Sequence, residues 1–177
     1  MKKIFCILLA LYSQGSYSQK IEDKKFDKFD STYTISTKDE TLVGKLMGRT
    51  FLFVRASFSW YRKAEFTNLP NAKSFRVLFG FKTNIVTSVD KGSEIKIEFA
   101  DGTIGTYSRP DAQYQIVTEM GFINFNVPVN DKLFTTDIKA IRVRTSETNL
   151  DYEIPSKKAS YTKNALALVK IESEKPL

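Results

Sequence analysis

Hydrophobic and polar residues alternate with a period of two along several stretches of this chain. The clearest run is residues 73–82 (KSFRVLFGFK). One side of this run carries Phe75, Val77, Phe79 and Phe81, and the other side carries Arg76, Leu78, Gly80 and Lys82. Successive side chains of a β-strand point to opposite faces, so this run predicts a strand with its phenylalanine-rich face buried.

Similar but shorter runs recur at a spacing of roughly ten residues, with turn residues between them. We expect further strands at residues 31–36, 49–62, 94–99, 103–108, 114–118, 121–129, 138–145 and 151–154. The dipeptide Asp101-Gly102 predicts a two-residue hairpin turn of type I′, which would pair Phe99 with Ile104. Short strands separated by turns indicate a mainly β protein, built as an antiparallel β-sandwich or barrel.

Two segments fit more than one structure. Residues 160–173 fit a helical face through Ala165, Leu166 and Val169, and a strand face through Ala165, Val169 and Ile171. Their alanine, leucine and lysine content favours a short C-terminal helix, although the order of their charges opposes the helix dipole. Residues 37–47 begin with the spacing of a capping box and predict a helix or, as an alternative, a loop.

Residues 1–18 have the composition of a signal peptide. Lys2 and Lys3 precede an apolar stretch at residues 4–12, and the small residues Ser16 and Ser18 follow it. The stretch is too short to span a membrane, which takes ~20 apolar residues, so we expect cleavage after Ser18 and no transmembrane anchor. The mature protein is then expected in the periplasm, on the outer surface or in the medium.

The mature chain is expected to form one β domain over residues 31–177, because this length is typical of a single domain. Before it, residues 19–30 (QKIEDKKFDKFD) are mostly charged. We expect them to form a solvated lead-in that Phe26 and Phe29 attach to the domain.

The composition excludes several classes of chemistry. The chain has no histidine, and its one cysteine, Cys6, lies in the predicted leader. Catalytic triads with histidine, thiolate nucleophiles and the usual zinc ligand sets are therefore excluded. The sequence also lacks glycine-rich phosphate-binding motifs. We expect no cofactor and no metal ion, and we assign no catalytic residue.

Four segments together resemble a loose group of small secreted bacterial β proteins of uncharacterised function. They are Phe26-Asp27-Lys28-Phe29-Asp30, residues 91–97, Asp101-Gly102-Thr103-Ile104 and residues 138–143. The resemblance covers most of the mature chain. It implies a β-sandwich and no particular activity.

The stretch from Arg55 to Lys63 mixes aromatic and basic residues and is the strongest candidate for a binding surface. Trp60 and Tyr61 point to opposite faces of a strand, so we expect Trp60 to share the buried face with Phe58. The solvent-facing candidates are then Arg55, Tyr61 and Lys63. Arginine, tryptophan and tyrosine are the residues most enriched at binding hot spots.

These observations favour a non-catalytic exported β domain that binds a glycan of the cell envelope or a partner protein. One alternative is an exported, glycosidase-like hydrolase that uses two carboxylates. Its candidate residues are Asp90, Glu94, Glu98, Asp101 and Glu119. A second alternative is a nucleic-acid-binding β-barrel. The aromatic residues favour it, as does the net charge of +5 that remains when Lys2 and Lys3 are removed from 27 basic residues against 20 acidic ones, while export opposes it.

Overall fold

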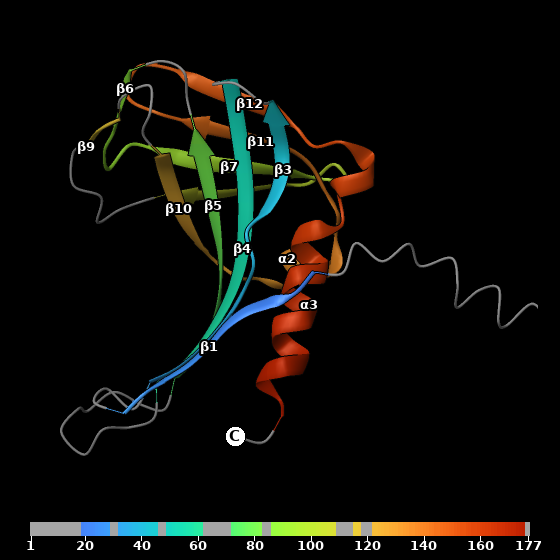
Figure 1. The fold of residues 1–177 in the computed structure, drawn as a ribbon. Helices are drawn as coiled ribbons and strands as arrows, with labels where there is room; N and C mark the ends of the chain where they lie inside the picture. The colour runs from blue at the N-terminus through green and yellow to red at the C-terminus, as the bar shows by residue number, and fades with distance from the viewer. Residues whose placement is uncertain are drawn as a thin grey trace, which may run out of the picture.

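The computed structural model describes residues 19–28, 32–45, 49–61, 72–82, 86–108, 115–117 and 122–175. In these ranges the protein is mainly β, and two antiparallel sheets pack as a sandwich with a C-terminal helix beside them (Figure 1). The predicted fold class is therefore confirmed. The predicted signal peptide and its cleavage site lie outside the described residues and stay predictions.

The six-stranded sheet is built around one long strand, β4. Its order is β1 (Ile21–Asp27), β2 (Thr32–Thr37), β4 (Arg49–Tyr61), β5 (Ala72–Lys82) and β10 (Phe122–Pro128). A further strand, β3 (Glu40–Lys45), pairs with residues 49–54 of β4, on the edge where β2 pairs with residues 57–61. One edge of β4 thus binds two strands in succession.

The four-stranded sheet has the order β12 (Asn149–Glu153), β11 (Ile138–Arg144), β7 (Glu94–Phe99) and β8 (Ile104–Ser108). Its strands run across those of the six-stranded sheet (Figure 1). A small pair, β6 (Thr87–Val89) and β9 (Gln115–Val117), lies apart from both sheets. The described helices are α2 (Asp131–Thr135), the 3₁₀ turn η1 (Ser156–Lys158) and α3 (Tyr161–Ser173).

Alternation along the strands builds the core between the sheets. The six-stranded sheet contributes buried side chains from even positions of β4 and odd positions of β5: Leu52, Val54, Ala56, Phe58, Val77, Phe79 and Phe81. The other sheet contributes Ile95, Ile97, Phe99, Ile141 and Val143. The inward face predicted for residues 73–82 is confirmed, because Val77, Phe79 and Phe81 are fully buried and Phe75 packs against the core.

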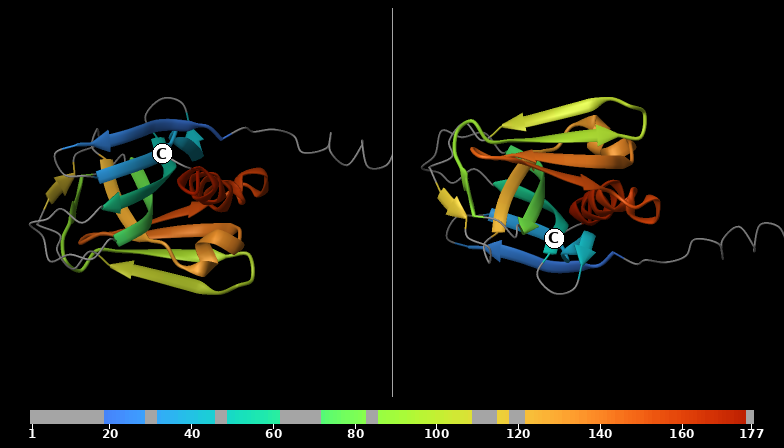
Figure 2. Two further views of the ribbon diagram at one scale, coloured as in Figure 1. Left: turned by 90° about the horizontal axis from the view of Figure 1, so that it is seen from below. Right: turned by 90° about the horizontal axis from the view of Figure 1, so that it is seen from above.

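The C-terminal helix covers one side of the sandwich. Figure 2 shows α3 (red) lying between the two sheets, and it packs against β2, β4 and α2. Its buried residues Ala165, Leu166 and Val169 follow the helical spacing expected from the sequence. The helix was the favoured interpretation of residues 160–173, and it is confirmed.

The hairpin at Asp101-Gly102 forms with a different register from the one predicted. Ile104 pairs with Glu98 rather than with Phe99. The backbone N–H of Gly102 donates to the carbonyl of Phe99, and the N–H of Phe99 donates to the carbonyl of Thr103. The loop therefore has three residues, with Gly102 in the left-handed region at φ 81°. This shift of one residue turns Ile104 to the outer face, where it is 66% exposed.

Replacing Gly102 with valine is expected to lower the free energy of unfolding by more than ~1 kcal/mol, since a β-branched residue resists positive φ. A Cβ at this position would meet no atom within 4 Å, so the loss would come from the backbone alone. Urea denaturation measures it, with Gly102→Asn as the control, because asparagine tolerates this conformation. Equal midpoints for Gly102→Val and the wild-type protein would contradict the turn assignment.

Two other expectations are wrong. Residues 40–45 form the strand β3 and not a helix, because pairing with β4 outweighs the weak local helical signal. Gly44 within this segment is itself unfavourable in a helix. The charged lead-in is not merely solvated, because residues 21–27 form β1 and pair with β2. Phe26 is 57% exposed and does not attach this segment to the core. Phe29 lies outside the described residues.

The loop after β11 is tied to β6 by one carboxylate. Glu147 accepts hydrogen bonds from the backbone N–H of Ser88 at 2.6 Å, from Ser88 Oγ at 2.5 Å and from Thr87 Oγ1 at 2.7 Å. These hydrogen bonds lower the pKa of Glu147 from its ordinary value of 4.5 to about 2, and the bond from Ser88 Oγ contributes most. Hydrogen bonds to the charged form explain the direction of this shift.

Acid should therefore weaken this loop. A carboxyl whose pKa is lower in the folded state stabilises the fold fully above its unfolded pKa, and loses that contribution as the pH falls through the folded pKa. The wild-type melting temperature is expected to exceed that of Glu147→Gln at neutral pH, and the gap should close between pH 4.5 and about 2. Thermal melts across this range measure the gap. A gap that stays constant with pH would contradict the role of Glu147.

Candidate functional site

The outer face of the six-stranded sheet, opposite the core, carries Arg55, one of the three residues that the sequence singled out. From residue 51 to residue 59 of β4, the odd positions, including Arg55, lie on this face and are only partly buried, while the even positions are buried. Trp60 is at an even position and packs against the core, as expected from its alternation with Phe58. The two faces of β4 are therefore assigned correctly.

Arg55 is held by two carboxylates. Its Nε donates to Oδ1 of Asp39 at 2.7 Å and its Nη2 donates to Oδ2 of Asp39 at 3.0 Å, and Glu22 lies 3.8 Å from Nη2. The hydrogen bond with Asp39 raises the pKa of Arg55 above its ordinary value. The guanidinium thus fixes the connection between β2 and β3 beside β4, and its planar fork is already occupied.

The other two sequence candidates are placed only in part. Tyr61 is the last residue of β4, and its backbone pairs with Thr32 and Ala72, but its side chain lies outside the described part. Lys63 lies outside the described residues altogether. The structure therefore brings only Arg55 onto the outer face with a defined side chain.

One phenylalanine ring lies over a glycine on this outer face, and a second lies beside another glycine. Phe53 pairs across the strands with Gly80, and a Cβ placed on Gly80 would stand 2.1 Å from Cε1 and Cζ of the Phe53 ring. Phe51 lies beside Gly44 of β3, whose Cβ would stand 3.5 Å from the Phe51 ring. The ring centroids of Phe51 and Phe53 are 6.0 Å apart. An aromatic ring that covers a cross-strand glycine rests on the backbone instead of standing upright.

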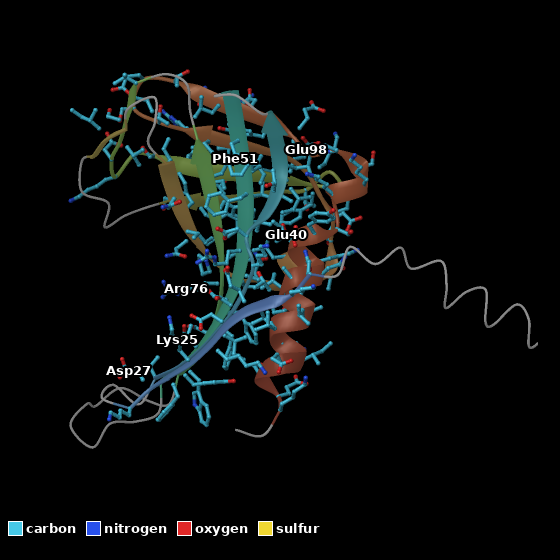
Figure 3. The ribbon with its side chains drawn as sticks, viewed as in Figure 1. Lys25, Asp27, Glu40, Phe51, Arg76 and Glu98 are labelled. Carbon is cyan, nitrogen blue, oxygen red and sulfur yellow. The ribbon has the colours of Figure 1, made fainter. Side chains whose placement is uncertain are left out.

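Polar and apolar side chains surround the two rings on the same face. Asn124 of β10 pairs with Gly80, which in turn pairs with Phe53. Asn126 of β10 pairs with Leu78, which in turn pairs with Arg55. Both asparagines are exposed, and Leu78 is partly buried. We call Phe51, Phe53, Leu78, Asn124 and Asn126 the phenylalanine platform. Figure 3 shows Phe51 on β4, and it shows Arg76 and Lys25 of the same sheet lower in the view.

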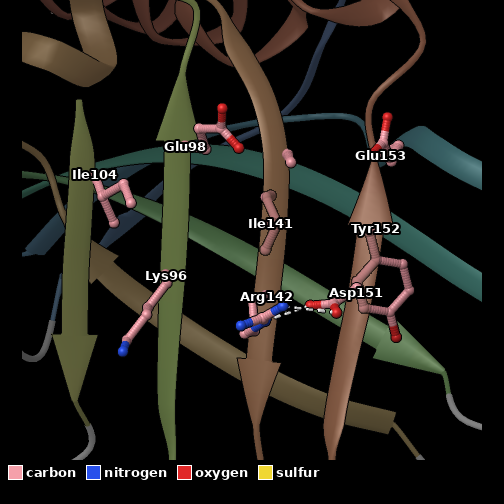
Figure 4. Close-up of a pocket in the computed structure, with 9 residues that line it drawn as sticks. Lys96, Glu98, Ile104, Ile141, Arg142, Asp151, Tyr152 and Glu153 are labelled. Carbon is pink, nitrogen blue, oxygen red and sulfur yellow. Dashed lines mark hydrogen bonds and ion pairs between the residues drawn. The ribbon is translucent and has the colours of Figure 1, made fainter. Parts of the chain in front are cut away.

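A second candidate is a hollow of about 320 Å³ on the outer face of the four-stranded sheet (Figure 4). Its centre is Ala140, whose small side chain lies between Glu98 of β7 and Glu153 of β12. Ile104 lines it from β8. The register of β7 and β8 places Ile104 beside Glu98, and the pairing of β11 with β7 is irregular between Ile138 and Ala140.

Arg142 and Asp151 in the hollow pair with each other, while Glu98 pairs with Lys139, which lies outside the lining. Arg142 donates to both carboxylate oxygens of Asp151, at 2.5 and 2.9 Å, and this lowers the pKa of Asp151. The ammonium of Lys139 lies 2.5 Å from Glu98. A glycosidase needs one carboxyl group that is kept protonated near neutral pH, which requires a raised pKa. The shift of Asp151 is in the opposite direction.

The other acidic candidates have structural partners or lie outside the described part. Glu94 pairs with Lys96 at 3.1 Å. Asp90 accepts a hydrogen bond from the N–H of Gly92, and Asp101 contacts Lys132 and Thr103. Glu119 is not among the described residues. Each of the described candidates thus has a local role in a turn or a surface ion pair.

The sequence revealed part of the platform but not its key contact. Phe51 and Phe53 are two positions apart in a predicted strand and so share a face, and the alternation of residues 73–82 puts Gly80 on the outward side of its strand. The missing step was the register of β4 against β5, which puts Phe53 opposite Gly80. A glycine inside a strictly alternating strand is the signal that could have indicated such a contact, because it often marks a close approach.

The comparisons with known proteins add no identity. No protein-family model and no curated protein matches this chain.

Within the described ranges, no group of three or more acidic, cysteine or histidine residues is placed to hold a metal ion. No helix in the same ranges is long and apolar enough to cross a membrane.

Proposed function

We propose that this protein is a non-catalytic, exported domain that binds a neutral glycan of the cell envelope through the phenylalanine platform. The observation that carries the proposal is the contact of the Phe53 ring with Gly80. This contact keeps the Phe53 ring close to the outer surface of the sheet, where the face of the ring can stack on the apolar face of a sugar.

The polar neighbours of the rings support a sugar ligand. The exposed amides of Asn124 and Asn126 each offer donors and an acceptor, which match hydroxyl and acetamido groups. Aromatic rings supply contact area at a low cost in side-chain entropy, and nearby amides supply adaptable hydrogen bonds. A flat surface of this kind suits an extended, β-linked chain better than a small compact ligand.

The charges on the same face favour a neutral ligand over a nucleic acid. Exposed Lys25 and Arg76 alternate with the acidic Asp23 and Asp27, and Arg55 is bound to Asp39. Nucleic-acid binding depends on a groove or stripe of unpaired basic residues that tracks the phosphates. A hydrolase is favoured less, because both carboxylate oxygens of Asp151 in the hollow accept hydrogen bonds from Arg142.

Isothermal titration calorimetry with soluble probes tests this proposal. Short β-linked oligosaccharides of glucose and of N-acetylglucosamine are titrated into the protein, and a single-stranded oligonucleotide serves as the competing probe. We expect saturable binding of at least one oligosaccharide that added salt does not weaken. Binding of the oligonucleotide alone, or of no oligosaccharide, would contradict the proposal.

A further inference from the structure

The edge strands of the two large sheets differ in how they are protected from pairing with another chain. Natural proteins protect sheet edges with charged residues or proline. Strand β1 carries five charged residues in its sequence IEDKKFD, β3 carries Glu40 and Lys45, β12 carries Asp151 and Glu153, and β10 ends in Pro128. Strand β8, with the sequence IGTYS, carries no charge and no proline.

Strand β8 is also accessible. It pairs only with β7 among the described residues, and Figure 2 shows it (yellow-green) as the outermost strand of its sheet in both views. Ile104, Thr106 and Ser108 are exposed on its outer face. In the part of the chain that the structure describes, the edge of β8 presents backbone donors and acceptors, and no charged residue or proline of β8 protects it.

We propose that β8 pairs antiparallel with β8 of a second copy of this chain, so that two four-stranded sheets become one continuous sheet. The strand has five residues, so full overlap places Thr106 on the two-fold axis, opposite Thr106 of the second copy. Such an interface is self-complementary, as two-fold symmetric dimers require.

The resulting cross-strand pairs are favourable. Thr106 faces Thr106, a pair that can hydrogen bond, and Ile104 faces Ser108. Gly105 faces Tyr107 of the other copy, and the Tyr107 ring stays against Gly105 of its own strand, where a Cβ would stand 3.1 Å from Cε2 of the ring. No charged residue is placed opposite another at this edge.

The nearest like charges across the axis are too far apart to prevent pairing. Lys96 lies next to Thr106 on the neighbouring strand β7. The two copies of Lys96 would be separated by three strand spacings of ~4.8 Å, or ~14 Å in total. This exceeds the screening length of ~8 Å at physiological ionic strength. By contrast, self-pairing of β12 would place Asp151, at the centre of its five residues, opposite its own copy.

Disulfide cross-linking tests the pairing and its register. The full chain carries Cys6→Ser, so that a single cysteine is introduced at Thr106 or, as the control, at Asn126 on the edge strand β10. Residues directly opposite in an antiparallel pair have Cβ atoms ~4.5–5.5 Å apart, close enough for a disulfide. We expect mild oxidation to convert Thr106→Cys to a covalent dimer and to leave Asn126→Cys monomeric.

Multi-angle light scattering provides the second measurement. We expect the wild-type protein to show a mass that rises toward the dimer with concentration, and Thr106→Lys to keep the monomer mass at every concentration, because it places two ammonium groups opposite each other. A monomeric wild-type protein, or equal cross-linking of Thr106→Cys and Asn126→Cys, would overturn the proposal. Cross-linking to a different protein instead of a second copy would overturn it as well.

Discussion

Replacing Phe79 with alanine is expected to lower the free energy of unfolding by ~3–5 kcal/mol, the usual cost of removing a buried phenylalanine ring. Phe79 is fully buried at the centre of the six-stranded sheet, where it pairs with Val54 on one side and Phe125 on the other. Neighbouring strands hold these residues in place, so the cavity is not expected to collapse. The loss would be a large part of the ~5–15 kcal/mol that stabilises a typical domain.

Urea denaturation of Phe79→Ala measures this loss, and Leu78→Ala is the matched control. Leu78 is the preceding residue on the same strand, but it lies on the outer face and is only partly buried. We expect Leu78→Ala to cost ~1 kcal/mol or less, since partly exposed positions lose little on truncation. If Leu78→Ala cost more than Phe79→Ala, the two faces of β5 would be reversed.

Replacing Phe53 with alanine is expected to weaken glycan binding by about 2 kcal/mol, or ~30-fold in the dissociation constant, while the fold stays intact. The variant removes the ring that lies over Gly80. Gly80→Ala is the companion variant, because its added Cβ would overlap the ring at 2.1 Å and push Phe53 away from the sheet without removing it. Both variants should therefore lose affinity.

Calorimetric titration with the tightest-binding oligosaccharide measures both changes, and Ile104→Ala serves as the control. Ile104 is exposed on the outer face of the other sheet, so its truncation should leave the affinity unchanged. Wild-type affinity in Phe53→Ala, or an equal loss in Ile104→Ala, would show that the phenylalanine platform is not the binding surface.

Much of the fold could be predicted because alternation is a local property of the chain. Residues 73–82 show which side chains of β5 are buried, and residues 138–145 do the same for β11, with no knowledge of their neighbours. The helix α3 could be favoured from composition, although a strand face fitted the same residues. These predictions depend only on the period of the side chains.

Pairing and register could not be predicted, because they depend on contacts between distant segments. Asp101-Gly102 indicates a hairpin, but the choice between a two-residue and a three-residue loop decides whether Ile104 faces inward or outward. Residues 40–45 have a weak helical pattern, and their strand conformation comes from pairing with β4. The charged residues 21–27 likewise become a strand through pairing with β2.

The candidate site depends on the same kind of information. Arg55 was found from the sequence, but its ion pair with Asp39 requires the turn between β2 and β3 to lie beside β4. The contact between Phe53 and Gly80 requires the register of β4 and β5, whose connecting residues carry no signal for it. Sequence reasoning therefore reached the outer face of β4 but not the contact between Phe53 and Gly80 on it.

Amide chemical-shift mapping tests the central claim most directly. The ¹⁵N-labelled protein is titrated with the oligosaccharide that binds most tightly, and the shift of each backbone amide is followed. We predict that the largest shifts cluster at residues 51–57, 78–81 and 124–126, on the three neighbouring strands that carry the phenylalanine platform. Shifts that cluster instead at residues 96–98, 140–142 and 151–153, around the hollow of the four-stranded sheet, would contradict the account.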